Sequence, residues 1–314
     1  MAKAIITQNR RPEDIRLIDA LAFANDLLVV RVEAGQLFQA YTQAPDSLIF
    51  LDGDDREGIE EFKKHLLSKV FPSRVFLISD QVLHAHPDLM EFAVCAHFLV
   101  RRFSGPAPTL YSRLVQASQF GFPQGIGAYF PEPADVQQIV ITRSGQKQKA
   151  VEAIQNVLVK RHVNSRLASL IAQVVDELIM NAIFDAPVLP SGMPLRKSTG
   201  RHLDFELIEK EHVFIEIASG RDYTAFSVTD QFGSLRKESL YRSLIREARD
   251  KSESLRKEEV GSGLALNGVI KSGVSLFFNC ELGKKTQITV LFNHNATFKD
   301  FRGGVRFLSV VEKT

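Results

Sequence analysis

The sequence lacks the features that mark membrane-spanning, secreted and nucleic-acid-binding proteins. Its formal net charge is only +2, so charge gives no reason to expect a nucleic acid or an anionic membrane as partner. The N-terminal stretch 1–14 has no apolar signal core. No apolar run approaches the ~20 residues that a membrane-spanning helix needs. We therefore expect a soluble cytoplasmic protein.

Cysteine is also scarce. Cys95 and Cys280 are far apart in the sequence, and each lies in an apolar run. This favours two buried thiols in a reducing compartment over a disulfide. The chain contains no internal repeat or low-complexity tract, and its 45% hydrophobic and 24% charged residues are typical of globular proteins. With 314 residues, it is long enough for two domains.

Residues 1–103 alternate short apolar runs with amphipathic segments. This alternation predicts a doubly wound α/β domain with a parallel five-stranded sheet. Ligands of such sheets bind beyond the carboxyl ends of the strands. Asp52, in LIFLDGDD, and Ser79, in VFLISD, each lie at such an end. The expected strands are 4–7, 27–32, 48–51, 74–78 and 97–100, and the expected helices are 12–24, 35–42, 57–70 and 87–95.

This pattern resembles the receiver domain of bacterial response regulators. The resemblance places Asp52 at the phosphoacceptor position, Ser79 at the hydroxyl position and Arg101 at the position of the usual lysine. Receivers carry an acidic pair after the first strand that holds magnesium, whereas this chain has Gln8 and Asn9 there. Without those carboxylates a hard cation is poorly held and phosphoryl transfer loses its charge neutralisation. We therefore expect a pseudo-receiver that acts as an interaction module, not a working phosphoacceptor.

Two other interpretations of the loop after the third strand stay open. Asp54 and Asp55 follow Asp52 and could in principle supply the missing carboxylates. The sequence D-G-D-D is also typical of a turn, so turn chemistry alone would explain Asp52.

Residues 104–135 are rich in proline and glycine and flank a short helical piece near 110–119, which predicts a linker between domains. The second domain then covers residues 136–314. Its pattern predicts a two-layer sandwich, with helices on one face of a mainly antiparallel sheet. The expected strands are 138–142, 212–218, 225–229, 274–280 and 287–292; the expected helices are 146–160 and one from about 165, with a polar loop at 187–204 and a charged surface helix or lid at 234–257.

The helix that continues through ASLIAQVVDELIMNAIFDAP carries the first candidate site residues. Glu177 and Asn181 stand four apart and therefore share one helix face. A carboxylate and an amide so placed can hold a divalent metal or orient an attacking hydroxyl. Taken alone, such a pair is usually a solvated helix edge.

Two later segments strengthen the interpretation of this helix as part of a binding site. The first is Asp230-Gln231-Phe232-Gly233, where a strand ends in a turn, and an aspartate there can accept a hydrogen bond from the exocyclic amine of adenine. The second is Gly261-Ser262-Gly263-Leu264, which opens a helix. Glycines at such a turn let the backbone approach a phosphate closely, and free N–H groups attract its charge.

The three segments together resemble the N box and the two glycine boxes of the GHKL superfamily of ATPases and histidine kinases, over about 136–292. The resemblance implies ATP and Mg2+ as cofactors. It makes Glu177 a base or water-positioning residue and Asn181 a magnesium ligand. It implies adenine recognition by Asp230, with Gly233 in the first glycine box and support from Thr286, and phosphate contacts by Gly261, Ser262, Gly263 and Leu264.

Within that superfamily the chain is most similar to the anti-sigma-factor serine kinases. One strand and one helix lead directly into the N-box helix, and no long helical hairpin precedes Glu177. His162 stands just before that helix, where we expect a surface or capping residue. The sequence departs from the family at the first glycine box, because Phe232 and Ser234 stand where glycines are usual. Phe232 could pack beside adenine or partly fill its pocket.

Three functions are consistent with these patterns. The first is a bacterial signalling protein in which a pseudo-receiver regulates an ATP-binding serine/threonine kinase or anti-sigma-type regulator. The second is a non-catalytic scaffold whose nucleotide site is degenerate, and the third is a histidine-kinase relative. The expected partner is a regulatory protein, substrate or sequestered factor, and a homodimer is also compatible with the sequence.

Overall fold

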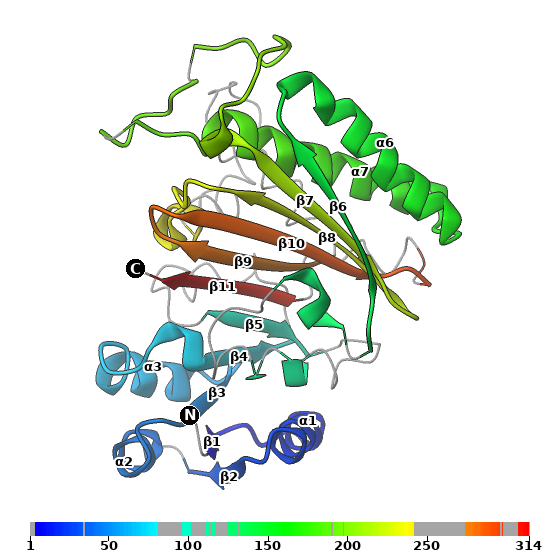
Figure 1. Cartoon of the computed structure of the whole chain (residues 1–314). Coiled ribbons are helices and arrows are strands. Elements are labelled where there is room, and N and C mark those ends of the chain that lie inside the picture. Colours follow the sequence, from blue (N-terminus) through cyan, green and yellow to red (C-terminus); the bar gives the residue numbers. More distant parts are fainter. Residues whose placement is uncertain are drawn as a thin grey trace, which may run out of the picture. The chain divides into compact units, whose positions relative to one another are not determined.

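The computed structural model divides the chain into two compact units, shown in Figure 1. Unit 1 comprises Met1–Pro131 and Arg306–Ser309, and unit 2 comprises Glu132–Val305 and Val310–Thr314. The protein is α/β and contains both parallel and antiparallel strands, as its alternating patterns predict. The structure describes residues 4–33, 35–80, 96–101, 111–113, 115–116, 125–130, 132–189, 191–196, 198–241, 274–295, 297 and 307–313.

Unit 1 is built on a parallel sheet in the strand order β2-β1-β3-β4-β5. Figure 1 shows helix α1 on one face of this sheet and helices α2 and α3 on the other. The two central strands are buried along almost their whole length, which explains their unbroken apolar sequences. The elements are β1 (Ala4–Thr7), α1 (Pro12–Ala24), β2 (Leu28–Arg31), α2 (Leu37–Gln43), β3 (Leu48–Asp52), α3 (Arg56–His65), η1 (Pro72–Arg74), β4 (Val75–Ser79), β5 (His97–Val100) and η3 (Ile126–Tyr129).

Local sequence signals mark the starts of helices α1 and α3 in unit 1. Pro12 occupies the first turn of α1, where its fixed φ suits the helix and its missing N–H costs nothing. The Asp55 carboxylate caps α3 by accepting hydrogen bonds from the backbone N–H groups of Glu57 (3.1 Å) and Gly58 (3.3 Å). Helix α3 ends at His65, five residues earlier than the sequence predicts, and the bond from Leu67 N–H to Phe62 O (3.0 Å) spans five residues where a helical bond spans four.

Strand β11 (Phe307–Lys313) was missed by sequence reasoning. Its first three residues belong to unit 1 and run antiparallel to β5, so that Ser309 pairs with His97. The hydroxyl of Ser309 and Nδ1 of His97 are 3.0 Å apart in a buried hydrogen bond. The prediction of five strands for the N-terminal sheet is therefore corrected to five parallel strands and one antiparallel strand contributed by the end of the chain.

Unit 2 is built on an antiparallel sheet in the order β9-β10-β8-β7-β6. Helices α6 and α7 pack against each other and cover one face of this sheet (Figure 1). This two-layer arrangement brings α7 against β8, the strand that ends at Asp230. The elements are β6 (Asp135–Ile141), η4 (Ser144–Gln146), α6 (Lys147–Lys160), α7 (Ser165–Met180), η5 (Asn181–Asp185), η6 (Glu209–Glu211), β7 (Val213–Ser219), β8 (Tyr223–Asp230), β9 (Ser275–Glu281) and β10 (Lys285–Asn293).

Helix α7 is the core helix of unit 2. His162 ends the preceding helix with a positive φ of 55°, and the Asn164 side chain then caps α7 by accepting a hydrogen bond from Arg166 N–H (3.0 Å). By length and composition, Ser165–Asp185 is long and apolar enough to cross a membrane, contrary to the expectation that no run is. Most of it is buried inside the protein, as in the core helix of a soluble protein.

Some of the sequence predictions concern residues that the structure does not describe. These are the helix at 87–95, most of the linker and lid, and Cys95. Cys280 is a buried free thiol on β9, and its S–H donates to the backbone oxygen of Leu235 (2.8 Å). Burial raises the pKa of the Cys280 thiol to about 11, so it is protonated at neutral pH.

Candidate functional site

The first group of candidate residues lies along the last turns of α7. Glu177 has about a third of its side chain exposed, and burial raises the pKa of its carboxyl group above the ordinary value. Arg201 and Lys147 oppose this rise, whereas Asp176 and Asp185 add to it. A carboxylate whose pKa is moved towards neutrality is suited to accept a proton from a hydroxyl group.

Asn181 opens η5, a π-helical turn at the end of α7. Ala186 N–H donates to Asn181 O (2.8 Å), which widens the helix by one residue at this point. Such turns are rare and occur often at functional sites. Both polar atoms of the Asn181 side chain are buried, and neither has a hydrogen-bond partner in the described part of the chain. Leaving such a group unpaired costs about 1–3 kcal/mol, which points to a ligand for the amide.

Asp230 and Thr286 lie opposite each other on β8 and β10. Asp230 is 7% exposed, and burial raises the pKa of its carboxyl group. Its Oδ1 accepts hydrogen bonds from the backbone N–H groups of Phe232 (2.8 Å) and Gly233 (3.2 Å). These backbone bonds and the neighbouring Thr286 oppose that rise in the Asp230 pKa. The structure therefore brings together Asp230, Gly233 and Thr286, which the sequence assigned to one site.

Gly233 has a structural requirement of its own. Its φ is 57°, and a Cβ at this position would lie 2.1 Å from the backbone oxygen of Glu281. Only glycine fits this turn. The half-buried ring of Phe232 lies beside Lys210, whose Nζ is 5.7 Å from the ring centre. Gly261, Ser262, Gly263 and Leu264 lie outside the described residues, so the predicted phosphate contact stays a prediction.

Two further charged residues join Glu177 and were missed by sequence reasoning. Asp185 follows Asn181 by four residues, and Arg201 lies in the loop between η5 and β7. Arg201 Nη2 is 3.2 Å from Asp185 Oδ2, and Arg201 Nη1 is 4.0 Å from Glu177 Oε1. The four-residue spacing of Glu177, Asn181 and Asp185 could have revealed the aspartate, but no local pattern identifies the arginine.

A separate cleft of about 370 Å³ lies beside α6 in unit 2. Its walls come from β6, α6 and β7, and include Asp135, Asn156 and Ile217. Neither Glu177 nor Asp230 lines it. We therefore do not assign this cleft to the candidate site, whose residues lie on α7, η5, β8 and β10; α7 and η5 contact β8, and β8 pairs with β10.

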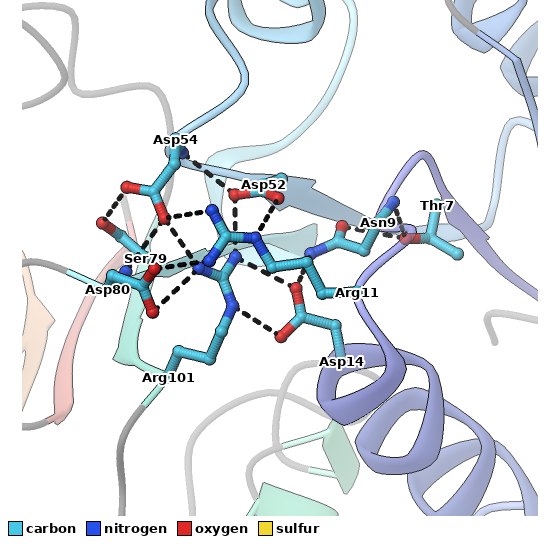
Figure 2. A network of polar contacts seen from close by, with 9 residues as sticks. All are labelled: Thr7, Asn9, Arg11, Asp14, Asp52, Asp54, Ser79, Asp80 and Arg101. Atoms are coloured by element: carbon cyan, nitrogen blue, oxygen red, sulfur yellow. Dashed lines mark hydrogen bonds and ion pairs between the residues drawn. The ribbon is translucent and has the colours of Figure 1, made fainter.

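Unit 1 contains a second cluster, centred on Arg101 (Figure 2). Only 3% of the Arg101 side chain is exposed. Its guanidinium contacts the carboxylates of Asp14 (2.9 Å), Asp52 (2.8 Å), Asp54 (2.7 Å) and Asp80 (3.2 Å). The sequence predicted that Asp52, Ser79 and Arg101 would lie together, whereas Asp14 and Asp80 were missed.

A second guanidinium group, that of Arg11, reaches the same carboxylates. It pairs with Asp80 and lies 3.6 Å from both Asp52 and Asp54. Among the described residues, two guanidinium groups therefore face four carboxylates. The cluster is therefore neutralised in part by the protein itself.

The remaining polar groups of this cluster have structural tasks. The Asn9 amide donates to Asp14 Oδ2 (2.8 Å), and the Ser79 hydroxyl donates to Asp54 Oδ1 (2.8 Å). Asp54 N–H donates to Asp52 Oδ1 (3.0 Å), so Asp52 is also a turn residue. The side chain of Gln8 turns to Glu61 on α3 instead (2.8 Å).

Asp54 and Asp55 are the possible substitutes for the acidic pair of receivers. In the structure Asp54 pairs with Arg101, and Asp55 caps α3. Within the described ranges, no group of three or more histidine, cysteine or acidic side chains is placed to hold a metal ion.

Comparison of the sequence with models of known protein families and with curated proteins finds no match. The arrangement of the side chains therefore has to carry any functional conclusion.

Proposed function

We propose that unit 2 binds ATP together with Mg2+ at the site formed by α7, β8 and β10, in the manner of the GHKL superfamily. The observation that carries this proposal is the buried and unpaired amide of Asn181, on a helix packed against the strand that ends at Asp230. The pairing of Asp230 with Thr286 supports it, because the resemblance gives both residues to adenine recognition.

The donor set at Asn181 fits a hard divalent cation. The amide oxygen of Asn181 is a ligand type that Mg2+ accepts, and it has no hydrogen bond to lose within the described part of unit 2. Asn181 would hold the ion, which would neutralise charge on the nucleotide phosphates. Glu177 would accept the proton of the attacking hydroxyl group, a task that its raised pKa favours.

The reaction proposed is phosphoryl transfer to a serine or threonine of a partner protein. In this proposal the protein is a cytoplasmic signalling kinase or anti-sigma-type regulator, and the residues at 261–264 contact the phosphates. Unit 1 serves as a regulatory interaction module. The part-neutralised cluster around Arg101 supports that role, because fixed guanidinium groups already bind the carboxylates of Asp52 and Asp54. A homodimer is compatible with both roles.

Substitution of Asn181 by leucine tests the proposal sharply. If the Asn181 amide is unpaired until a ligand binds, Asn181→Leu removes an unpaired buried polar group. The free energy of unfolding of the nucleotide-free variant should then equal or exceed that of the wild type. A non-hydrolysable ATP analogue with Mg2+ should raise the melting temperature of the wild type and bind at least about tenfold more weakly to the variant. Asn156→Leu, at an exposed position on α6, is the matched control.

Asp230→Asn tests the adenine contact separately. Its Oδ1 can still accept the hydrogen bonds from Phe232 and Gly233, so the turn should persist while recognition of the adenine amine is lost. No response of the wild type to the analogue would refute nucleotide binding. For transfer itself, label from γ-³²P-ATP should appear on a partner purified together with the protein and be lost in Glu177→Ala.

A second candidate, a non-catalytic scaffold, is favoured by one observation. Oδ1 of the Asp230 carboxylate already accepts two hydrogen bonds, from the backbone N–H groups of Phe232 and Gly233. A carboxylate has about four acceptor positions, so the turn itself already uses part of the capacity that adenine recognition would need. The scaffold predicts that Asp230→Asn and wild type respond alike to nucleotide.

The histidine-kinase alternative gains nothing from the geometry. His162 ends α6 in a left-handed conformation, which is a capping position.

A further inference from the structure

The loop between η5 and β7 is fastened to the core of unit 2 by a buried arginine. Arg196 Nη2 lies 2.6 Å from Glu211 Oε2, and these two side chains are only 10% and 6% exposed. Arg196 Nη1 also donates to the backbone oxygen of Ile183, in the π-helical turn (3.1 Å). Its guanidinium lies 4.8 Å from the ring centre of Phe205, and that ring meets Phe184 edge-on. Arg196, near the start of the loop, and Phe205, near its end, therefore both contact residues of η5.

This anchoring places Arg201 against the candidate site. Its guanidinium contacts Asp185 through Nη2 (3.2 Å), lies 4.0 Å from Glu177 and is 6.0 Å from the ring centre of Phe184. Arg201 is thus within contact distance of two carboxylates about two turns apart on the helix that also carries Asn181. Because Arg201 belongs to a different segment, it can hold Glu177 in place in a way that α7 cannot.

We propose that Arg201 is a positioning residue for Glu177, holding its carboxylate for proton acceptance through joint contact with Glu177 and Asp185. This inference rests on the proposed function, since it names a further residue for the same reaction. Among the described residues, the charged groups that act on Glu177 are Arg201 from the loop, Asp185 from η5, Lys147 from α6 and Asp176 from α7 itself. Lys147 pairs with Asp176 at 2.7 Å, so within this part of the chain Arg201 is the cation that Glu177 and Asp185 share.

The test compares Arg201→Ala with Arg201→Lys and with Arg221→Ala, a control at an exposed arginine in the β7–β8 turn. The first measurement needs no nucleotide. The Glu177 carboxyl group is titrated by ¹³C NMR, with its signal assigned through Glu177→Gln. Arg201 opposes the upward shift of the Glu177 pKa, so Arg201→Ala should raise that pKa further and Arg201→Lys should raise it less.

The second measurement is phosphoryl transfer or ATP hydrolysis as a function of pH. Arg201→Ala should lower kcat about tenfold or more with little change in KM for ATP, and should move the acidic limb of the profile to higher pH. Arg201→Lys should recover part of the loss, and Arg221→Ala should behave as wild type.

The possible outcomes distinguish failure of the Arg201 role from failure of the proposed ATP-dependent function. An unchanged Glu177 pKa in Arg201→Ala overturns the inference even if the protein uses ATP. A raised pKa with unchanged kcat overturns the positioning role. If wild type binds no nucleotide, the proposed function fails and the inference with it, while the titration still shows whether Arg201 controls the Glu177 carboxyl group.

Discussion

Replacement of Arg101 by methionine tests the ion-pair cluster of unit 1. The change keeps an unbranched side chain of similar length and removes the guanidinium group that four carboxylates share. Of the two guanidinium groups that the described residues bring to this cluster, Arg11 would remain to oppose these carboxylates, and 40% of its side chain is exposed. Asp14, 1% exposed, would keep the Asn9 amide as a donor but lose its countercharge.

The size of the stability loss in Arg101→Met depends on how deeply each ion pair is buried. Breaking a buried ion pair by removing one partner costs about 3–5 kcal/mol, because the other charge is left uncompensated. The Arg101–Asp14 pair is of this kind, with 3% and 1% exposure. The pairs with Asp52, Asp54 and Asp80 are more exposed, so each adds less than about 1 kcal/mol. The Asp14 pair alone therefore sets a lower bound, and we expect unit 1 to lose at least about 3–5 kcal/mol.

Hydrogen exchange measured by mass spectrometry can follow unit 1 separately from unit 2, which a single unfolding transition cannot. The amides of β1 and β3 in Arg101→Met should exchange roughly 10²–10⁴ times faster than in wild type, and the amides of β7 and β8 at the wild-type rate. Arg10→Met is the control, since Arg10 is 65% exposed and pairs with an exposed glutamate. Addition of Asp14→Asn should restore part of the protection.

An acceleration below tenfold, or one equal to that of Arg10→Met, would refute the idea that this guanidinium supports the fold.

Three other predictions concern pH and the loops. Burial raises the pKa values of Asp54 and Asp80, but hydrogen bonds and the arginine charges outweigh it and hold both values below the ordinary 3.8. The stability that these carboxylates give to unit 1 is therefore present above pH 3.8 and should be lost as the pH falls through their folded-state pKa values. Unchanged protection of the β1 amides at about pH 3 would contradict this. Gly233→Ala should destabilise unit 2 by several kcal/mol or prevent folding, because a Cβ would lie 2.1 Å from a backbone oxygen, and circular dichroism melting measures it. Arg196→Met should cost about 3–5 kcal/mol by stranding the buried Glu211 carboxylate, and faster proteolysis within 187–206 would report the loosened loop.

Local patterns in the sequence were sufficient for most elements. The five parallel strands of unit 1 were predicted to within one residue at either end, and α1 was predicted at its observed bounds. These elements depend on the spacing of apolar residues and on proline, both of which act within a few positions. The same periodicity placed Glu177 and Asn181 on one helix, and the strand-end rule placed Asp52 and Asp230 at sheet edges.

The tertiary structure decided most of the ion pairs, although the meeting of Asp52 with Arg101 was predicted. Arg101 also meets aspartates from α1, from the loop after β3 and from the residue after β4, and Arg201 meets carboxylates 16 and 24 positions earlier in the chain. The pairing of β11 with β5 joins segments some two hundred residues apart. Hydrophobic periodicity is a property of neighbouring residues, so it fixes which segments fold into helices and strands. Which charged side chains form ion pairs depends instead on how those segments pack, because a buried charge pairs with an opposite charge that packing places within a few ångströms of it.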